Sequence, residues 1–540
     1  MDNDRFLKGK KNKRTKNKKL ILKNEKINKK ILNKINKTKK KKTFFIIMII
    51  IILLISFSLF FLLKFRVNKI KRNIFDGNIK YSKYEEEFKN KNSTCDGLDP
   101  INIFKLRIDK GPIEICSEGK SKHICYQNAG NNYYNEIFNH KNGVICKMEN
   151  IILDPSKSRQ SGLSYKDGPV DNSNHGLPFL DKGFINADCK AKGGFSNYNE
   201  LYNTYFNSWN YEYNINNENL DELAPGKTVL FISRNQDSPN LFYGNSDIIN
   251  ALSMIYFFNL DPNDVQVVFL ESMEIPYYAE ENSENKDLPR DPFYDIYKKM
   301  ISRGGEPIYI KNLKKKYKIS KAIHVPINWD SPLSIEIDFP TCDHRTKTYK
   351  LYNDFIDKYM DIKPFKDTFI SDNETYYYPE SVLKSHESNI KFDKIVTIQW
   401  RRIWPKNRKG QGRIMNNGPQ LADKLASLLP KNILVRLVNN AKFTIEGQIS
   451  LVRNTDYLLG LHGAGLSLVM FLPQNSIYQE MQNRKVKSQL CVVSSLSGHK
   501  TYVDEIKNSA NNVDGNEMID FDEEEVAKKV LEHMKENNFI

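Results

Sequence analysis

The 540-residue sequence lacks the short motifs that mark several common classes of site. No two cysteines stand at the spacing of a zinc finger, and no zinc-finger, RRM or other nucleic-acid-binding signature is present. A Gly-x-Ser-x-Gly elbow, which carries the nucleophile of many esterases, is also missing. These absences argue against a structural zinc site, a nucleic-acid partner and hydrolysis by a serine at such an elbow.

Excess positive charge is confined to the first 43 residues. The chain has a formal net charge of +17, but residues 1–43 alone hold 19 Lys and Arg against three acidic residues. The remaining 497 residues carry 63 basic and 62 acidic groups, so they are close to neutral. The basicity belongs to a tail and does not indicate a nucleic-acid-binding surface on the folded part.

A 20-residue uncharged apolar run, residues 44–63, follows the basic tail directly. Its length suits a helix that crosses the hydrocarbon core of a bilayer. The flank before the run is far more basic than the flank after it, which predicts a cytosolic tail and a lumenal or external remainder. A cleaved signal peptide is the competing interpretation, but the long basic region, the long apolar run and the lack of a small-residue cleavage site argue against it. The sequence therefore predicts an uncleaved type II signal anchor.

All seven cysteines lie beyond the apolar run, and five of them fall within residues 95–189. This distribution is typical of disulfides formed in an oxidising compartment. Because the number is odd, at least one cysteine is free or pairs with another chain. Two sequons, at Asn92 and Asn373, offer acceptors for N-glycans on the same side of the membrane.

Strand-like and helix-like segments alternate in two regions of the chain. The first region has apolar strands at 227–233 and 265–271, with a helix-like run from about Ser246 to Phe258 between them. In the second region the strands are expected at 394–400, 432–438, 457–460 and 476–481, and the helices at 420–429, 445–454 and 465–472. This alternation predicts an α/β fold with a parallel sheet covered on both faces, in which ligands bind outside the carboxyl ends of the strands.

The stretch "LHGAGLSLVMFL" (461–472) stands at such a strand end. His462 ends the strand, and a helix-like run begins after Gly463, Ala464 and Gly465. Glycine permits a sharp turn or a close approach of the backbone to a ligand, and the N–H groups of a helix start can bind an anion. A tight strand–helix turn with a hydrogen-bonded histidine explains the same four residues equally well, so the motif alone leaves both interpretations open.

The wider pattern closely resembles the carboxyl-terminal signature of glycosyltransferase family 61, which includes lumenal O-linked N-acetylglucosaminyltransferases and plant xylosyltransferases. That signature has a Gln near a helix start, then R-x-x-D, G-x-H-G-A-G-L and F-x-P-x-x-S-x-x-x-E. The matching residues are Gln448, Arg453, Asp456, Gly460, His462, Gly463, Ala464, Gly465, Leu466, Phe471, Pro473, Ser476 and Glu480. The resemblance covers roughly residues 227–500 and leaves the first 226 residues uncovered.

The resemblance implies a GT-B architecture: two Rossmann-like domains that face each other across a cleft. It further implies inverting transfer without an essential metal and without a cofactor. The one Asp-x-Asp beyond the tail, Asp520-Phe521-Asp522, lies in an acidic stretch that reads as a helix start, not as the metal-binding loop of a GT-A enzyme. We expect a cytosolic tail, a signal anchor, a stem, an acceptor-side domain and a nucleotide-sugar-binding domain at 1–43, 44–63, 64–94, 95–385 and 386–540.

Without a metal, a departing diphosphate needs fixed cations and N–H donors. The family pattern upstream of the His-Gly-Ala-Gly turn places Arg401 and Arg413 where they can serve with His462. Asn416 also matches the family, whereas Asn417 replaces its usual Glu. The expected donor-binding residues are Arg401, Arg413, Asn416, Gln448, His462, Gly463, Ala464, Gly465 and Glu480, with Glu480 expected to accept hydrogen bonds from the ribose.

The family pattern N-x-x-H-x-x-x-D matches at Asn240 and Asp247 but has Tyr243 in place of the His. A phenol, with a pKa near ~10, is a poor base at neutral pH. Asp247 is therefore the expected base that deprotonates the acceptor hydroxyl, since inverting transfer needs one group to take that proton. Glu271 and His462 are its rivals, and a helix-capping role for Asp247 is the structural alternative.

The sequence therefore predicts a single-pass type II glycosyltransferase of the Golgi or endoplasmic reticulum membrane. It would transfer GlcNAc or xylose from a UDP-sugar to a glycan or protein hydroxyl. The alternative is a catalytically inactive lumenal protein of the same fold that binds a glycan or a nucleotide-sugar. That alternative is based on Tyr243 and Asn417, which replace family residues.

Overall fold

The computed structural model describes most of residues 94–540. The segments that it does not describe are 1–93, 110, 128–143, 160–178, 193–202, 216–218, 235–239, 271–292, 328–330, 332, 334–337, 373, 403–412, 483–487, 507 and 514–515. The predicted tail, signal anchor and nearly all of the predicted stem therefore lie outside the described residues, as do Asn92, Asn373 and Glu271. In the part of the chain that is described, no helix has both the length and the apolar character of a bilayer-spanning segment.

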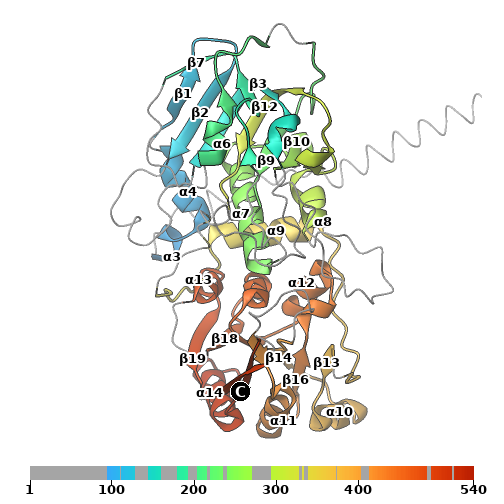
Figure 1. The fold of residues 1–540 in the computed structure, drawn as a ribbon. Helices are drawn as coiled ribbons and strands as arrows, with labels where there is room; N and C mark the ends of the chain where they lie inside the picture. Colours follow the sequence, from blue (N-terminus) through green and yellow to red (C-terminus); the bar gives the residue numbers. More distant parts are fainter. Residues whose placement is uncertain are drawn as a thin grey trace, which may run out of the picture. The chain divides into compact units, whose positions relative to one another are not determined.

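Ten strands of the described residues form the first sheet (Figure 1). Its strands β11-β10-β9-β12 are mutually parallel, and the sheet continues antiparallel from β12 through β3-β2-β1-β7, with β6 paired to β3 and β8 to β6. The bounds are β1 (Ile113–Ser117), β2 (Lys122–Gln127), β3 (Val144–Leu153), β6 (Ile185–Ala187), β7 (Lys190–Ala191), β8 (Trp209–Asn210), β9 (Thr228–Ile232), β10 (Val265–Phe269), β11 (Ile308–Tyr309) and β12 (Tyr317–His324). The apolar segments predicted as strands at 227–233 and 265–271 are the buried strands β9 and β10.

Helix α7 (Leu241–Phe257) packs on β9 and begins earlier than the sequence pattern predicts. The side chain of Asn240 accepts a hydrogen bond from the Phe242 N–H at 3.0 Å and caps the helix, which therefore begins at Leu241, five residues before the expected start at Ser246. The remaining helical elements of this half are α3 (Thr94–Gly97), α4 (Pro100–Asp109), η1 (Pro155–Lys157), α6 (Asn203–Asn207), η5 (Pro262–Asp264), α8 (Tyr294–Ile296), η6 (Tyr297–Ile301), η7 (Ile310–Asn312) and α9 (Lys347–Tyr359). A two-stranded sheet pairs β4 (Ser158–Arg159) with β5 (Phe179–Leu180).

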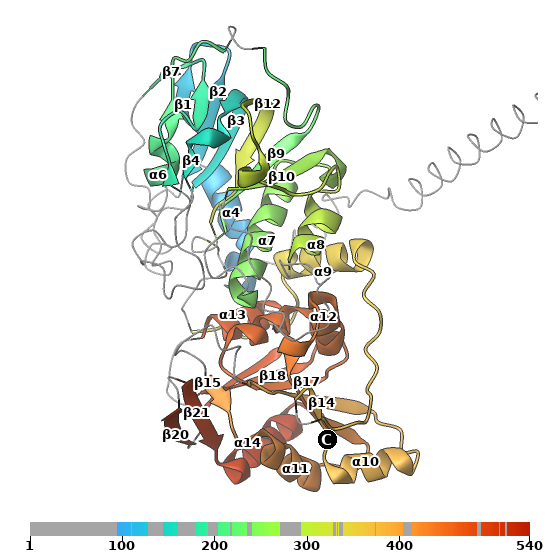
Figure 2. The same cartoon turned by 45° about the vertical axis from the view of Figure 1, so that its right-hand side comes forward.

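Six strands of the described residues form the second sheet, in the order β13-β16-β14-β17-β18-β19 (Figures 1 and 2). Every neighbouring pair is parallel except β13 with β16. The bounds are β13 (Tyr376–Tyr377), β14 (Lys394–Gln399), β16 (Ile433–Val438), β17 (Tyr457–Leu461), β18 (Ile477–Gln482) and β19 (Lys500–Glu505). The four strands predicted after residue 390 are thus confirmed to within two residues, and β16, β17 and β18 are buried along their whole length, as expected in a sheet covered on both faces.

Helices cover both faces of the second sheet (Figures 1 and 2). On one face α11 packs against α14, and on the other α12 and α13 each contact η10. Their bounds are α10 (Glu380–Glu387), α11 (Gly418–Leu428), η9 (Asn440–Lys442), α12 (Ile445–Arg453), η10 (Ala464–Phe471), α13 (Gln489–Leu496) and α14 (Glu523–Glu536). β15 (Arg413–Met415), β21 (Asn516–Phe521) and β20 (Asn508–Val513) form a separate small sheet in that order. The protein is a mixed α/β structure with two main sheets.

Three disulfides and one free cysteine account for the seven cysteines. The bonds are Cys95–Cys342, Cys116–Cys189 and Cys125–Cys146, and Cys491 is free and buried. The prediction of disulfides with at least one unpaired cysteine is confirmed. Three such bonds in one chain indicate an oxidising compartment, as in the secretory pathway.

The chain between the sheets is fixed by buried polar contacts. Asp99 is fully buried, and it accepts hydrogen bonds from the backbone N–H and the hydroxyl of Thr348, each at 2.8 Å, which ties α4 to the start of α9. Further on, the buried Arg436 of β16 donates to both carboxylate oxygens of Asp367 at 2.8 and 2.7 Å. The segment after α9 is therefore joined to the second sheet well before β13 begins.

Candidate active site

The strand order of the second sheet reverses between β14 and β17. The chain moves from β14 to β16 on one side and then returns to β17 on the other side of β14. The loops after β14 and β17 therefore diverge, and in open α/β sheets such a switch point at the carboxyl edge is where ligands bind. Arg401 lies two residues after β14, and His462 lies directly after β17. The structure brings these two predicted residues together at that point.

The contact between them explains the first glycine of the motif. Nη1 of Arg401 donates a hydrogen bond to the carbonyl oxygen of His462 at 2.5 Å. A Cβ at position 463 would lie 1.6 Å from that Nη1 atom, so any larger residue would displace the guanidinium. The φ of Gly463 is 168°, which is extended backbone. Space for Arg401, and not a turn that only glycine can make, is therefore the requirement.

Gly465 likewise leaves space for a side chain, in this case that of Gln399. A Cβ there would lie 2.0 Å from Nε2 of Gln399, the last residue of β14. The predicted helix at 465–472 is a 3₁₀ helix, η10, whose first turn closes with a bond from the Leu466 N–H to the Gly463 carbonyl at 2.9 Å. Both glycines thus let polar side chains from the end of β14 lie against the start of η10.

His462 is held by Glu480 from the neighbouring strand. Nδ1 of His462 lies 2.6 Å from Oε1 of Glu480, and the His462 side chain is 26% exposed while that of Glu480 is fully buried. Glu480 pairs with Gly460 in the ladder between β17 and β18, so its side chain shares a sheet face with His462, two residues further on. A partly exposed imidazole thus rests on a buried carboxylate.

Glu480 has further partners on the same face. Gln482 donates to Oε1 at 2.7 Å, and Tyr478 and Ser488 donate to Oε2 at 2.9 and 2.7 Å. Burial alone would raise the pKa of Glu480, but the hydrogen bond and charge of His462, with the Ser488 and Gln482 bonds, hold the pKa below its usual value. The carboxylate is therefore ionised at neutral pH. The ribose contact predicted for Glu480 would require one of these donors to be displaced.

The second predicted arginine lies on a neighbouring element. Arg413 begins β15, and the backbone N–H of Met415 in that strand donates to the Arg401 carbonyl at 2.9 Å. Asn416, the next predicted donor-binding residue, donates through Nδ2 to Asp520 at 2.8 Å. Asn417 donates to the Phe521 carbonyl and to Glu523, at 2.7 and 2.6 Å. Asn417, which replaces the family Glu, thus links the start of α11 to β21 and α14.

Gln448, predicted near a helix start, is buried in the first half of α12. Its Nε2 donates to the Phe443 carbonyl at 3.1 Å. Its Oε1 is buried and has no hydrogen-bond partner among the residues that the structure describes. An orphaned buried acceptor on an element that follows the carboxyl end of β16 can be satisfied by a ligand donor.

Helix α7 of the first half packs against η10. Nδ2 of Asn245 lies 3.3 Å from the Ser467 hydroxyl, and Oδ1 of Asn245 accepts from the Tyr352 hydroxyl at 3.0 Å. Asp247 lies in the same part of the helix, and its side chain is 1% exposed. The capping role belongs to Asn240, whereas Tyr243 is partly buried with its ring edge-on to Phe242.

The acidic Asp-x-Asp has structural roles. Asp522 caps α14 by accepting a hydrogen bond from the Glu525 N–H at 3.0 Å, as the sequence predicted for a helix start. Elsewhere in the described chain, His123, Cys125 and Cys146 lie close enough together to share a metal ion, but the two cysteines are bonded to each other.

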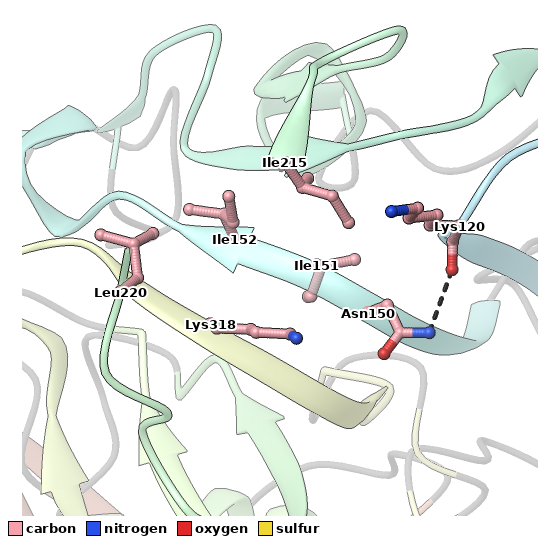
Figure 3. Close-up of a pocket in the computed structure, with 7 residues that line it drawn as sticks. All are labelled: Lys120, Asn150, Ile151, Ile152, Ile215, Leu220 and Lys318. Carbon is pink, nitrogen blue, oxygen red and sulfur yellow. Dashed lines mark hydrogen bonds between the residues drawn. The ribbon is translucent and has the colours of Figure 1, made fainter. Parts of the chain in front are cut away.

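A separate cavity of about 350 Å³ lies on the first sheet (Figure 3). Lys318, at the start of β12, and Lys120 bound a floor that includes Ile151 and Ile152 of β3, and Asn150 donates to the Lys120 carbonyl at 3.0 Å. The amino-terminal part of a parallel strand is the end opposite to the usual ligand edge. We therefore do not place the candidate site in this cavity, and we use its residues as control positions for mutations at the candidate site.

The central part of the chain matches a family model. The match is to Glycosyltransferase 61 and spans residues 307–478. These residues are a glycosyltransferase 61 region. The resemblance inferred from the motifs is confirmed there, and a glycosyltransferase region implies a sugar donor and an acceptor as substrates. The glycosyltransferase 61 match includes Arg401, Arg413 and the His462 turn, but it ends two residues before Glu480 and does not reach α7. No curated protein matches the chain.

Proposed function

We propose that the protein is an inverting glycosyltransferase of GT-B architecture that transfers GlcNAc or xylose from a UDP-sugar to a glycan or protein hydroxyl. The observation that carries the proposal is the contact of Arg401 with the His462 carbonyl at the switch point of a parallel sheet, within the glycosyltransferase 61 region. In this proposal residues 95–385 form the acceptor-side domain and residues 386–540 the nucleotide-sugar-binding domain.

The donor diphosphate is the natural occupant of the switch point. Arginine offers a planar fork of N–H donors that suits phosphate oxygens, and Arg401 and Arg413 lie on connected elements after β14. The buried, unpartnered oxygen of Gln448 is a candidate to accept a hydrogen bond from the nucleotide. Asn416 is a further candidate for contact with the nucleotide near Arg413. These fixed cations and dipoles stand in for a metal, so the proposed reaction needs none.

Transfer follows from this arrangement in one displacement. The acceptor hydroxyl oxygen forms a bond to the anomeric carbon on the face opposite the diphosphate, and the bond from that carbon to the diphosphate oxygen breaks. The electron pair leaves with UDP, and the hydroxyl proton passes to a base. We assign that base to Asp247, because α7 is joined to η10 through Asn245 and Ser467. Asp247→Asn is expected to abolish transfer while UDP binding persists; transfer that persists would move the role to His462 or Glu271.

The membrane orientation is a second part of the proposal. The +16 tail, the apolar run at 44–63 and the three disulfides beyond it support a type II protein of the endoplasmic reticulum or Golgi membrane, with residues 64–540 in the lumen. Protease added to intact microsomes should remove the tail alone. Digestion of the disulfide-bonded part with protection of the tail would exclude this orientation.

The function is tested by a screen of donors on the full-length chain in detergent. UDP-GlcNAc, UDP-xylose, UDP-galactose and GDP-sugars are compared for binding and for hydrolysis without acceptor. Turnover of a UDP-sugar supports the enzyme. Tight binding with no turnover, with or without acceptor glycans, would instead favour the inactive binding protein. Tyr243 in place of the family His is a reason to consider that alternative. Absence of both would exclude either form of the proposal.

A further inference from the structure

The carboxylate of Glu480 is saturated by hydrogen bonds. A carboxylate has about four lone-pair positions, and four donors lie within 2.9 Å of its two oxygens: His462 and Gln482 at Oε1, Tyr478 and Ser488 at Oε2. The Cys491 thiol adds a longer contact at 3.5 Å. With no exposed surface and no free lone pair, Glu480 is built to hold a protein group in place and not to receive a ligand directly.

Only one of these partners can carry a positive charge. Tyr478, Ser488 and Gln482 are neutral donors, so the buried negative charge of Glu480 is balanced by His462 when its imidazole is protonated. Within the part of the chain that the structure describes, Arg401 is a further charged group at His462, and it bonds the backbone carbonyl and not the ring. Because Nδ1 faces the carboxylate at 2.6 Å, the proton on Nδ1 is the one that is held.

The second nitrogen of the ring is thereby left for a ligand. Nε2 of His462 makes no hydrogen bond with any residue of the described chain, and about a quarter of the side chain is exposed. A carboxylate behind a histidine fixes the ring orientation and stabilises the imidazolium. Glu480 therefore contacts one nitrogen of the His462 ring, and the other nitrogen is available to a ligand at the switch point.

We propose that Glu480 is a positioning residue: it holds the Nδ1 proton of His462 so that the imidazolium presents its Nε2–H to the departing diphosphate of the donor. This proposal rests on the proposed function. As the bond from the anomeric carbon to the diphosphate breaks, the leaving oxygen gains charge, and Nε2–H donates a hydrogen bond to the diphosphate. No bond to the histidine forms, the Nδ1 proton stays between His462 and Glu480, and the acceptor proton goes to the separate base.

A double-mutant cycle on the full-length chain separates this role from direct ribose binding. Glu480→Gln keeps the shape of the side chain but removes its charge, and it is expected to lower kcat about 10²-fold with the donor KM within threefold of wild type. In a His462→Ala background the same change should cost less than threefold more, because Glu480 acts through the ring. Asp504→Asn, which removes a buried carboxylate bonded to Gln479 in the same sheet, is the matched control and should leave kcat unchanged.

Three results would overturn the proposal. A tenfold or greater loss of UDP affinity from Glu480→Gln in both backgrounds would mean that the carboxylate binds the ribose. Equal losses of kcat in both backgrounds would mean that the carboxylate acts independently of His462. A loss of thermal stability in Glu480→Gln without an effect on kcat would mean a structural role.

The proposal can be judged even where the wild type transfers no sugar, which would defeat the proposed function. Imidazole ¹⁵N spectra of the ligand-free full-length chain at pH 8 then decide. A His462 ring that carries protons on both Nδ1 and Nε2 in the wild type, and loses one of them in Glu480→Gln, supports the positioning role. A neutral ring in the wild type, or spectra that do not change in Glu480→Gln, would contradict it.

Discussion

Nη1 of Arg401 lies 2.5 Å from the carbonyl oxygen of His462, and only a glycine at position 463 leaves room for it there. The contact joins the loops after β14 and β17 at the point where the strand order of the second sheet reverses. A guanidinium fixed in this way keeps its remaining N–H groups in one place. The account of a diphosphate site depends on this relationship.

Gly463→Ala should therefore act through Arg401. The added methyl group would stand 1.6 Å from Nη1 and push the guanidinium away. We expect UDP affinity to fall about tenfold or more, the scale of one lost hydrogen bond to a charged group. The control is Gly97→Ala in α3, where no atom lies within 4 Å of the added Cβ. Isothermal titration with UDP checks both, and equal affinity in the two variants would contradict the role of Arg401.

Arg413→Ala should lower kcat on the order of 10²-fold, as expected for the loss of one electrostatic donor to a leaving group. Initial rates with saturating donor measure it. Lys318→Ala is the matched control, because it also removes one cation but lines the separate cavity on the first sheet. A loss of less than about threefold in Arg413→Ala would place this arginine away from the diphosphate.

The disulfides should differ in their contribution to stability. Cys95–Cys342 closes a loop of 247 residues, whereas Cys125–Cys146 joins residues 21 apart on neighbouring strands. In the chain-entropy model the longer loop gives about 2 kcal/mol more stabilisation of the folded state. Chemical denaturation of the two double Cys→Ala variants measures the difference. A larger loss for Cys125–Cys146 would show that native packing, and not loop length, dominates.

Mild acid should weaken the fold through two buried histidines. Burial lowers the pKa of His324 to about 3, and burial with the charge of Arg345 lowers the pKa of His499 to about 3. In the unfolded chain both protonate near pH ~6.5, so below that pH the unfolded state binds more protons and the free energy of unfolding falls.

Between pH 7.5 and 5.5 each of these two histidines should cost about 1.4 kcal/mol of stability. Thermal unfolding at the two pH values measures the loss. His499→Leu should flatten the dependence, whereas His386→Gln, at an exposed position, should leave it unchanged. A midpoint that does not move between pH 7.5 and 5.5 would contradict the burial of neutral histidines.

The second sheet could be predicted closely because most residues of its central strands are apolar, which indicates buried strands. Segment 433–438 is apolar except for Arg436, and a strand with so little polar surface is expected to be buried on both faces of a covered sheet. The start of α7 was placed too late for a local reason: Asn240, which caps the helix, directly follows Pro239, and Gly244 interrupts the helical pattern of the first turns. Caps can be recognised in a sequence, but competing Asn and Ser residues leave their position open.

The candidate site could be predicted only in part. The motif gave His462 and its glycines, but the reason for the glycines is steric and depends on Gln399 and Arg401, more than 60 residues earlier. The saturation of Glu480 involves Ser488 at the start of α13 and could not be inferred from spacing. One signal was available: the alternation of Tyr478, Glu480 and Gln482 in one strand places all three on the same face.

The buried Arg436 is another residue that the sequence did not reveal. It stands in the middle of an apolar strand, where a charge is costly unless it is paired. Its partner, Asp367, lies 69 residues earlier in a segment without regular structure. Pairings of this kind appear only when the fold brings distant segments together.

The central claim is that a nucleotide diphosphate binds at the Arg401–His462 contact without a metal. Titration of UDP into wild-type protein and Arg401→Ala, each in the presence of EDTA, tests it most directly. We predict saturable binding by the wild type that EDTA does not abolish, and at least a tenfold weaker affinity in Arg401→Ala with unchanged thermal stability. Binding that is lost in EDTA, or that is equally tight in Arg401→Ala, would contradict the account.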